Sequence, residues 1–464
     1  MLQRLYPFVA ACVALAACAG HSATAPPVPI GPLSQTAGDL SAGPDSARSK
    51  IKHIVIIVQE NRSFDGLFHG FAGANYANSG KNSLGQTIPL SAVSFAANYE
   101  LCHNFADANF DIDPDNDGDE TMNGFDDPSC KVDGSPPPDP AYKYVSVQET
   151  THYFSLAKDY SLGDEFFSSQ RDGSYVGHQY LIASQAGWAI NTPSGFPWGC
   201  DAPQGTLVQL INAQGQKTKE VFPCFTYATL GQNLDAKGIS WKYYSPPISD
   251  EGYLWTAYDA IKGVCNFMNN ACQGTEWTTH MITPQCQVLT DAAAGNLPAV
   301  TWVIPDLADS DHPLSLSTTG PKWVTAVVDA IGANTALWNS TAIFVTWDDW
   351  GGFYDHVRPP DKAQHGFAPD VDGPGMRVPL IAISPYTIAG TITHKKYDGF
   401  AAIIKTVEQL NGLSSMTPRD TAATSLFDDK AIFDFKGAPH KFTSVTNTGY
   451  TCNPADSRPI DTDL

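Results

Sequence analysis

Three apolar segments of the chain each run directly into polar residues that are able to bind a metal ion. These residues are Glu60 and Asn61 after the first segment, Asp306, Asp309, Asp311 and His312 after the second, and Asp348 and Asp349 after the third. Carboxylate and amide oxygens suit hard divalent cations such as Mg, Ca or Mn, and Zn becomes suitable once histidine joins them. A single acidic end would mean little, whereas three that converge would form a metal site.

The apolar segments have the pattern of β-strands that are buried on both faces. Runs of this type cover Ile54–Val58, Ala299–Pro305, Ala342–Thr346 and Val378–Ser384. Amphipathic patterns over Lys322–Ile331 and over Phe400–Leu410, the latter followed by Gly412, predict helices. Together they predict an α/β fold with a mainly parallel central sheet and helices on both faces. Ligands of such sheets bind beyond the carboxyl ends of the strands, which is where the acidic residues stand.

The N-terminus has the pattern of an export signal. Arg4 precedes a short apolar run, too short to span a bilayer, and Leu15-Ala16-Ala17-Cys18 resembles the bacterial lipobox, in which the cysteine is acylated. An ordinary signal peptide is the alternative. Both predict export, either to the cell envelope (outer membrane or periplasm) through a lipid anchor at Cys18 or as a secreted protein.

The rest of the chain divides by composition. Residues 1–18 form the predicted lipoprotein signal peptide, and residues 19–50, rich in Ala, Pro, Ser and Gly, a flexible tether. Residues 51–464 are expected to form one domain. Loop-rich cap insertions are expected at about 85–150 and 187–290, where Pro, Gly, Asn and most cysteines lie.

The cysteine content agrees with export. Ten cysteines include two in the predicted signal peptide, and the remaining eight form an even set that predicts disulfides in an oxidising compartment. Proximity in sequence favours the pairs Cys102–Cys130 and Cys200–Cys224. The spacing C-x-x-C of a zinc site does not occur among them.

The charge balance bears on partners. The chain has 48 acidic and 27 basic side chains, a net charge of -21. Nucleic-acid binding is disfavoured because it needs basic groups to replace phosphate counterions. Attraction to anionic membranes is disfavoured too, so membrane contact is expected only through the lipid anchor.

Two long motifs resemble the bacterial phosphoesterase family that contains phospholipases C and an acid phosphatase. Residues 59–65 (QENRSFD) are close to its E-N-R-S-F-D signature, residues 348–357 (DDWGGFYDHV) to its D-E/D-x-G-G-x-Y-D-H-V segment, and residues 377–385 to its R-V-P…I-S-P strand. The matching blocks extend from about residue 50 to 420. The resemblance implies an alkaline-phosphatase-like fold and attack on phosphorus by a Ser or Thr hydroxyl, which is activated by a metal or a base.

The candidate nucleophile is Ser174. The family places this residue after a Gly-containing turn and ahead of an aromatic-rich helix, as in Gly173-Ser174 followed by residues 178–181 (HQYL). The sequence departs from the commoner G-P-[ST]-x-P-N form. Ser168 and Ser169 therefore remain competitors for the role.

The resemblance also implies roles for other residues. The family's metal-binding positions fall on Glu60, Asn61, Asp348 and Asp349. Protonation of a leaving group needs an acid, and histidine titrates in the useful range. The candidates are His103, His312 and His356, for each of which a purely structural role is the alternative.

A separate acidic run has the D-x-D-x-D-G pattern of a calcium loop. Asp113, Asp115 and Asp117 are its candidate ligands for a structural calcium ion. The twelfth position from Asp113 is Gly124, where a bidentate Glu belongs. A solvated acidic loop is the alternative.

These features predict an exported, metal-dependent hydrolase of phosphoesters, phospholipids among them. A phospholipase C-like phosphodiesterase is the main hypothesis, and an acid phosphatase of the same family is the alternative. A non-catalytic calcium-binding lipoprotein would need a broken site. A sulfatase would need a C/S-x-P-x-R run, which the sequence lacks.

Overall fold

The computed structural model describes residues 44–116, 120–360, 373–445 and 449–452. The predicted signal peptide, Cys18 and the predicted tether up to residue 43 lie outside these ranges. The tether prediction was wrong for its last seven residues, because Pro44–Lys50 form helix α1. Ala47 in this helix is buried, and Arg48 donates to the backbone carbonyl of Gln409.

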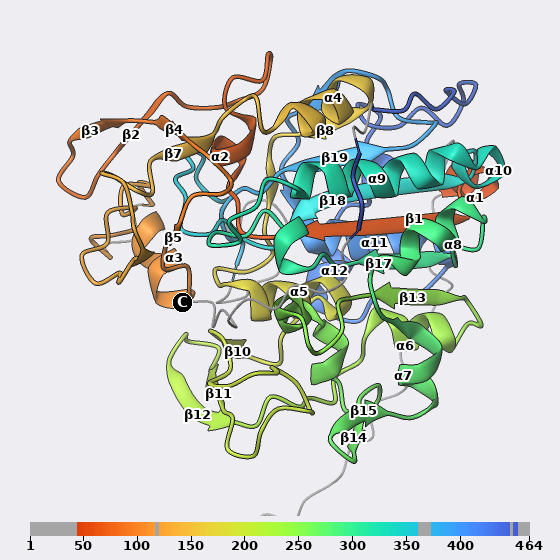
Figure 1. Cartoon of the computed structure of the whole chain (residues 1–464), viewed down its shortest axis with the longest axis horizontal. Helices are drawn as coiled ribbons and strands as arrows, with labels where there is room; N and C mark the ends of the chain where they lie inside the picture. Colours follow the sequence, from red (N-terminus) through yellow and green to blue (C-terminus); the bar gives the residue numbers. More distant parts are fainter. Residues whose placement is uncertain (1–43, 117–119, 361–372, 446–448, 453–464) are drawn as a thin grey trace, which may run out of the picture. The chain divides into compact units, whose positions relative to one another are not determined.

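Eight strands in the described part of the chain form a central sheet in the order β16-β13-β17-β1-β18-β19-β8-β20 (Figure 1). The strands are β16 (Met281–Ile282), β13 (Trp241–Tyr244), β17 (Val300–Val303), β1 (His53–Gln59), β18 (Thr341–Trp347), β19 (Leu380–Ile383), β8 (Ser161–Gly163) and β20 (Thr391–Thr393). Neighbours are parallel except for β19, which runs antiparallel to β18 and β8. The four predicted strands and the mostly parallel sheet are thereby confirmed.

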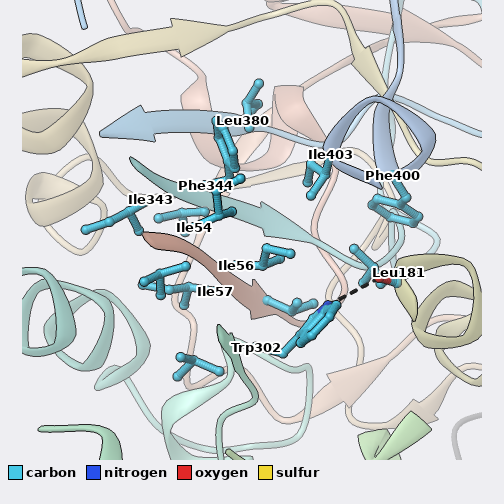
Figure 2. Packing of buried hydrophobic residues seen from close by; sticks show 14 of the residues in the cluster. Ile54, Ile56, Ile57, Leu181, Trp302, Ile343, Phe344, Leu380, Phe400 and Ile403 are labelled. Carbon is cyan, nitrogen blue, oxygen red and sulfur yellow. Dashed lines mark hydrogen bonds between the residues drawn. The ribbon is translucent and has the colours of Figure 1, made fainter. Parts of the chain in front are cut away.

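The side chains of strand β1 are buried on both faces of the sheet. Successive side chains of a strand face opposite sides of the sheet, and every residue of β1 after His53 is buried. Figure 2 shows Ile54, Ile56 and Ile57 in a core of aliphatic and aromatic side chains, to which Phe400 and Ile403 of helix α11 (Gly399–Asn411) also belong. Burial on both sides removes the polar/apolar alternation and leaves the continuous apolar run seen in the sequence.

Helices surround the sheet in two groups. α9 contacts α4, α8 and α10, whereas α11 contacts α1, α5 and α12. The helices after α1 are α2 (Phe64–Phe68), α3 (Phe105–Ile112), α4 (Thr151–Asp159), α5 (Ser174–Ala183), α6 (Leu230–Asp235), α7 (Thr275–His280), α8 (Gln287–Ala293), α9 (Gly320–Ala333), α10 (Thr335–Trp338), α11 (Gly399–Asn411) and α12 (Pro418–Ala422), with 3-10 turns η1 (Glu251–Trp255), η2 (Ala257–Ala260), η3 (Leu307–Asp309) and η4 (Leu426–Asp428). The two predicted helices correspond to α9 and α11. Gly412 ends α11 in the left-handed conformation (φ 65°).

Residues 79–145 contribute three two-stranded sheets outside the central sheet, drawn in orange in Figure 1. They pair β2 (Ser79–Lys81) with β3 (Thr87–Pro89), β4 (Ser91–Val93) with β7 (Lys143–Val145), and β5 (Tyr99–Glu100) with β6 (Asp133–Gly134). Their buried side chains form a second hydrophobic cluster, which also takes in Trp350, Phe353 and Tyr354 from the segment after β18. This second cluster therefore holds the loop that follows Asp348 and Asp349.

The insertion predicted over residues 187–290 was wrong in part. β13 and β16 lie in this range, yet they extend the central sheet beyond β17. Neither has a long aliphatic run, since β13 reads WKYY and β16 has two residues. Other strands of the range, β10 (Ala189–Ile190), β11 (Val208–Ile211), β12 (Lys217–Val221), β14 (Asn266–Met268) and β15 (Ala271–Gln273), form separate small sheets, as do β9 (Phe166–Phe167) and β21 (Tyr397–Asp398).

Disulfides join the eight cysteines outside the predicted signal peptide. The pairs are Cys102–Cys130, Cys200–Cys224, Cys265–Cys272 and Cys286–Cys452. The first two were predicted and are confirmed. Among the described residues, no helix has the length and hydropathy that a membrane span requires.

Candidate active site

The pairing of β1 with β18 brings two of the predicted metal-binding motifs together. The strands are parallel, and Gln59 at the end of β1 is in register with Trp347 at the end of β18. The next residues, Glu60 and Asp348, therefore leave the sheet at the same height. Both are fully buried.

Asn61 turns the chain sharply at this edge. Its backbone is left-handed (φ 53°), a conformation that Asn tolerates better than most residues. Its backbone N–H donates to Oδ1 of Asp348, with a nitrogen-to-oxygen distance of 3.1 Å. Gly351, which is also left-handed, packs so closely against the Asn61 carbonyl that a Cβ there would clash. The two loops are thus held together by a hydrogen bond from the Asn61 backbone N–H to the Asp348 side chain and by close packing of the Gly351 backbone.

Ser174 reaches these loops from the first residue of α5. Its buried Oγ lies 3.2 Å from Oδ1 of Asn61 and 3.3 Å from Oδ2 of Asp349. Both oxygens are acceptors, so they hold the hydroxyl in a defined orientation. The position at a helix N-terminus favours negative charge near the hydroxyl.

The competing serines are engaged elsewhere. Ser168 donates to the backbone carbonyl of Gln170 at 2.9 Å. Ser169 donates to Asp398 and accepts from the first amides of α11, so it serves that helix. Ser174 is the candidate whose hydroxyl lies within hydrogen-bond distance of Asn61 and Asp349.

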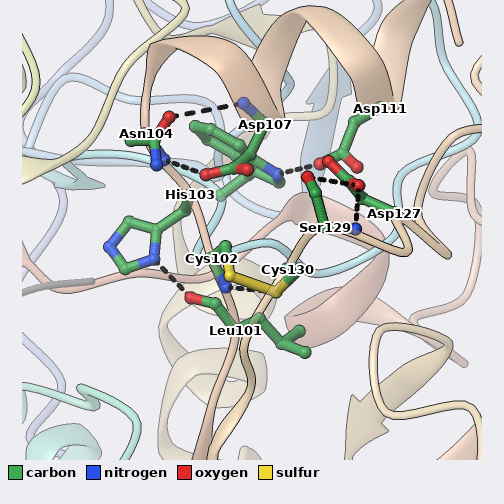
Figure 3. The surroundings of a disulfide bond; sticks show 10 residues. Leu101, Cys102, His103, Asn104, Asp107, Asp111, Asp127, Ser129 and Cys130 are labelled. Atoms are coloured by element: carbon green, nitrogen blue, oxygen red, sulfur yellow. Dashed lines mark hydrogen bonds between the residues drawn. A yellow bond between two sulfur atoms is a disulfide. The ribbon is translucent and has the colours of Figure 1, made fainter.

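His103 fixes the orientation of the Asn61 amide. Its Nε2 lies 3.0 Å from Nδ2 of Asn61, and its Nδ1 lies 2.7 Å from the carbonyl of Leu101 (Figure 3). The carbonyl can only accept, so Nδ1 carries the proton and Nε2 accepts from Asn61. This arrangement turns Oδ1 of Asn61 toward Ser174. The neighbouring Cys102 is joined to Cys130 by a disulfide, and Leu101 packs in the second cluster, so the His103 segment is held in place.

His178 is a further member of the cluster that the sequence prediction missed. It lies one helical turn after Ser174 on α5, on the same face. Its Nε2 is 2.9 Å from Oε1 of Glu60 and 3.8 Å from Oδ2 of Asp348, and all three side chains are buried. The spacing of four residues from Ser174 was the signal that could have identified it.

The donor set fits a divalent cation. Three carboxylates (Glu60, Asp348 and Asp349) gather with the Asn61 amide oxygen and the Ser174 hydroxyl in a buried place, and an ion would offset their charge. Within the described residues, Oδ2 of Asp348 is buried and has no hydrogen-bond partner. A buried carboxylate oxygen in that state is stabilised by a cation.

The third acidic strand end contacts other residues. His312 lies 3.5 Å from Glu100, and both side chains are buried. Asp306 accepts from Gln285, and Asp311 accepts from the Tyr153 hydroxyl at 2.6 Å. The two regions are nevertheless linked, since the Glu60 backbone amide donates to the Ser310 carbonyl at 2.8 Å and the Trp347 indole donates to Asp311 at 3.2 Å.

His356 belongs to a different cluster. Its ring nitrogens contact Asp65 at 2.7 Å and Asn75 at 3.1 Å. Burial lowers the pKa of His356, but the hydrogen bond and charge of Asp65 outweigh burial and raise this pKa above its ordinary value. Arg377 donates to both Asp65 and Asp355 here, so a guanidinium already supplies the positive charge that an ion would bring.

The predicted calcium site is described only in part. Asp113 ends α3 and Asp115 is exposed, whereas Asp117 lies outside the described residues. The calcium ion therefore remains a prediction.

Comparisons with known proteins fit this arrangement. A sequence model described as the Phosphoesterase family matches residues 51–414. Phospholipase C B of Mycobacterium tuberculosis is 25% identical over 459 residues, which cover 88% of this chain and 82% of the relative. Hemolytic phospholipase C of Pseudomonas aeruginosa is 24% identical over 431 residues, covering 84% of this chain and 56% of the relative. Non-specific phospholipase C6 of Arabidopsis thaliana is 35% identical over 163 residues, 30% of this chain and 31% of the relative.

Proposed function

This chain belongs to the Phosphoesterase family and is a phosphoric ester hydrolase, and on that premise we propose that it cleaves phosphodiesters in the manner of a phospholipase C, with Ser174 as nucleophile and a divalent metal ion as cofactor. The observation that carries the proposal is the pair of contacts from Ser174 Oγ to Asn61 and Asp349. A hydroxyl needs such a setting, because on its own it is a weak nucleophile.

Ser174 acts as the attacking group in this proposal. Asn61 and Asp349 accept from its hydroxyl and orient it, and the N-terminus of α5 favours the negative charge that develops on oxygen and phosphate. His103 keeps the Asn61 amide from rotating, since rotation would present NH2 instead of the acceptor oxygen to Ser174. Attack breaks the bond between phosphorus and the leaving alcohol, which departs with a proton, and leaves the phosphoryl group with its second ester substituent on Ser174 Oγ until water hydrolyses this bond.

The acidic group supports a cofactor role for a metal ion. Glu60, Asn61, Asp348 and Asp349 would hold a divalent cation, which supplies positive charge to the phosphoryl oxygens when it is bound. We propose that the buried His312 supplies the proton for the leaving group, and that His103, whose Nε2 accepts from Asn61, acts by positioning that side chain. We propose a positioning role for His356, since its contacts are with Asp65 and Asn75.

The substrate class follows from the relatives. Proteins named phospholipase C match more than four-fifths of this chain, which favours a phosphodiester such as a phospholipid head group. A phosphomonoester is the alternative substrate. The N-terminal sequence supports export, with the lipid anchor at Cys18 as the proposed attachment.

One experiment distinguishes a phosphodiesterase from a phosphomonoesterase and tests whether the activity needs a metal ion. Purified protein is given p-nitrophenyl phosphate or the p-nitrophenyl ester of phosphocholine, with and without EDTA, and p-nitrophenol release is followed. The proposal expects the diester to be cleaved and EDTA to abolish cleavage. Turnover of the monoester alone would indicate an acid phosphatase, and inactivity on both would refute the hydrolase mechanism. Undiminished activity after complete metal removal would refute the metal's role.

A further inference from the structure

His178 faces two carboxylates at once. Its Nε2 lies 2.9 Å from Oε1 of Glu60 and 3.8 Å from Oδ2 of Asp348. One oxygen atom from each carboxylate and one imidazole nitrogen lie within 4.8 Å of one another. The three residues come from the end of β1, from α5 and from the end of β18, so the fold itself brings them together.

A hydrogen bond explains the distance from His178 to Glu60 but not the distance from His178 to Asp348. An imidazole nitrogen carries at most one hydrogen, and at 2.9 Å that hydrogen serves Glu60. The distance of 3.8 Å to Asp348 is too long for a hydrogen bond. Oδ2 of Asp348 is nevertheless buried without a hydrogen-bond partner among the described residues.

Shared coordination of an ion accounts for both distances. Ligand atoms that each lie about 2.0–2.2 Å from a metal are about 3–4 Å apart, depending on the angle between them. Both separations, 2.9 and 3.8 Å, fall close to that range. The same cation would satisfy the buried oxygen of Asp348.

We propose that His178 is a nitrogen ligand of the metal site, beside Glu60 and Asp348, and that the site therefore takes a divalent transition metal ion such as Zn²⁺ rather than Ca²⁺ or Mg²⁺. Imidazole suits zinc and its neighbours, whereas calcium and magnesium prefer oxygen donors alone. The inference rests on the proposed function only in placing the cofactor at this acidic group.

The first measurement identifies the zinc ligands in the full-length protein, and it requires that another possible metal site be removed first. Two further groups of described residues have metal-ligand spacing. Asp65, Asp355 and His356 are already paired with the Arg377 guanidinium, whereas Asp235, Glu276 and His280 could bind the same ion. His280→Gln removes this group and leaves the Ser174 region untouched. Metal-free His280→Gln protein is therefore loaded with Zn²⁺, and its zinc-edge X-ray absorption is recorded. The expected ligand shell contains one imidazole, and a shell of oxygen atoms only would overturn the inference.

A variant provides the affinity test. His178→Gln, made in the His280→Gln background, is expected to lose about 100-fold or more in Zn²⁺ affinity, measured by competition with a chromophoric chelator. Its Mg²⁺ and Ca²⁺ affinities should change less than about threefold, because they depend on the oxygen donors. His53→Gln is the matched control, since that ring lies at the opposite end of β1 and contacts the Pro298 carbonyl. Equal Zn²⁺ affinity with and without His178 would overturn the inference.

The outcomes separate this inference from the proposed function. If circular dichroism shows that His178→Gln does not fold, the absorption spectrum of the His280→Gln protein decides the matter alone. Zinc bound through imidazole in a protein that cleaves neither nitrophenyl substrate would support the ligand and refute the hydrolase. Metal-dependent cleavage by a protein whose zinc ion has only oxygen ligands would support the hydrolase and refute His178 as a ligand.

Discussion

The hydroxyl of Ser174 lies 3.2 Å from the side-chain oxygen of Asn61, although 113 residues separate them in the sequence. Asn61 stands where β1 leaves the sheet, and Ser174 stands where α5 begins. The link continues through the Asn61 amide to His103, at 3.0 Å. One asparagine thus connects the proposed nucleophile to a histidine held by the second cluster.

Ser174→Ala should abolish turnover. Loss of a nucleophile leaves only the electrostatic contribution of the site, so kcat is expected to fall about 10³-fold or more, with the melting temperature nearly unchanged. The measurement is steady-state hydrolysis of p-nitrophenylphosphocholine. Ser168→Ala is the matched control, because that hydroxyl contacts the Gln170 carbonyl, and it should retain activity. Full activity in Ser174→Ala would refute the assignment.

His103→Ala should lower kcat more than it raises KM. Without its Nε2, the Asn61 amide can rotate and the Ser174 hydroxyl loses one of its two acceptors, so kcat is expected to fall about 10²-fold. Kinetics at saturating and limiting substrate separate the two constants. His152→Ala, whose ring contacts Thr325, serves as control. A rise in KM alone would indicate that His103 binds substrate rather than orienting Asn61.

The sequence was informative where burial leaves a strong pattern. β1, β17 and β18 are covered on both sides, so they read as continuous apolar runs, and their ends pointed to Glu60 and Asp348. The antiparallel direction of β19 could not be predicted, because a strand buried on both sides has the same apolar composition whether it runs parallel or antiparallel to its neighbours. β8 and β20 have three residues each, too few for any periodicity.

Residues of the site were predictable only when a motif carried them. Glu60, Asn61, Asp348 and Asp349 stand in long ordered motifs, whereas His178 is a single histidine on a buried helix. Which histidines face the site depends on the packing between loops that are distant in the sequence. His356, for example, lies in a matching motif, but its ring nitrogens contact Asp65 and Asn75.

The Cys102–Cys130 disulfide should matter for activity as well as stability. It closes a loop with a sequence separation of 28 residues, so replacing both cysteines by serine is expected to cost about 3–4 kcal/mol in the free energy of unfolding. Because Cys102 adjoins His103, kcat should fall too. Replacing Cys265 and Cys272, which join β14 to β15, should cost less stability and leave kcat unchanged. Equal kcat values in the two double variants would contradict this prediction.

Arg377 should be replaceable neither by lysine nor by methionine. Its guanidinium is fully buried and donates to Asp65, to both oxygens of Asp355 and to the carbonyls of Asn75 and Asp164. Removing it takes the guanidinium away from two buried carboxylates and leaves His356 as the partner of Asp65, at a cost of about 3–5 kcal/mol in the free energy of unfolding measured with urea. Lysine cannot reproduce the bidentate geometry.

The outcome for Arg377 is judged against Arg48. Arg48→Ala removes donors to a single carbonyl, that of Gln409, and should cost about 1 kcal/mol. If Arg377→Lys were as stable as the wild type, the positive charge would matter and the bidentate geometry of the guanidinium would not.

Asp311 should make the protein less stable as the pH rises toward neutrality. Burial raises the pKa of this carboxyl from 3.8 to about 7, and hydrogen bonds from Tyr153 and Trp347 only partly oppose the rise. Between these two values the folded protein holds a proton that the unfolded chain has lost, so the free energy of unfolding falls with pH. The stabilising contribution is complete below pH about 4 and is lost as pH rises through about 7, a change of about 4 kcal/mol.

Asp311→Asn should remove this pH dependence. Asn resembles the protonated carboxyl, can still accept from Tyr153 and tolerates the left-handed backbone of residue 311 (φ 73°). Urea unfolding from pH 4 to 8 should therefore give a flatter profile than wild type, with a gain in stability at pH 7. Tyr153→Phe should shift the loss to higher pH, because its hydrogen bond lowers the pKa of Asp311. Asp434→Asn, at an exposed position, removes the same charge and should keep the wild-type slope. An unchanged slope in Asp311→Asn would mean that another buried group controls the pH dependence.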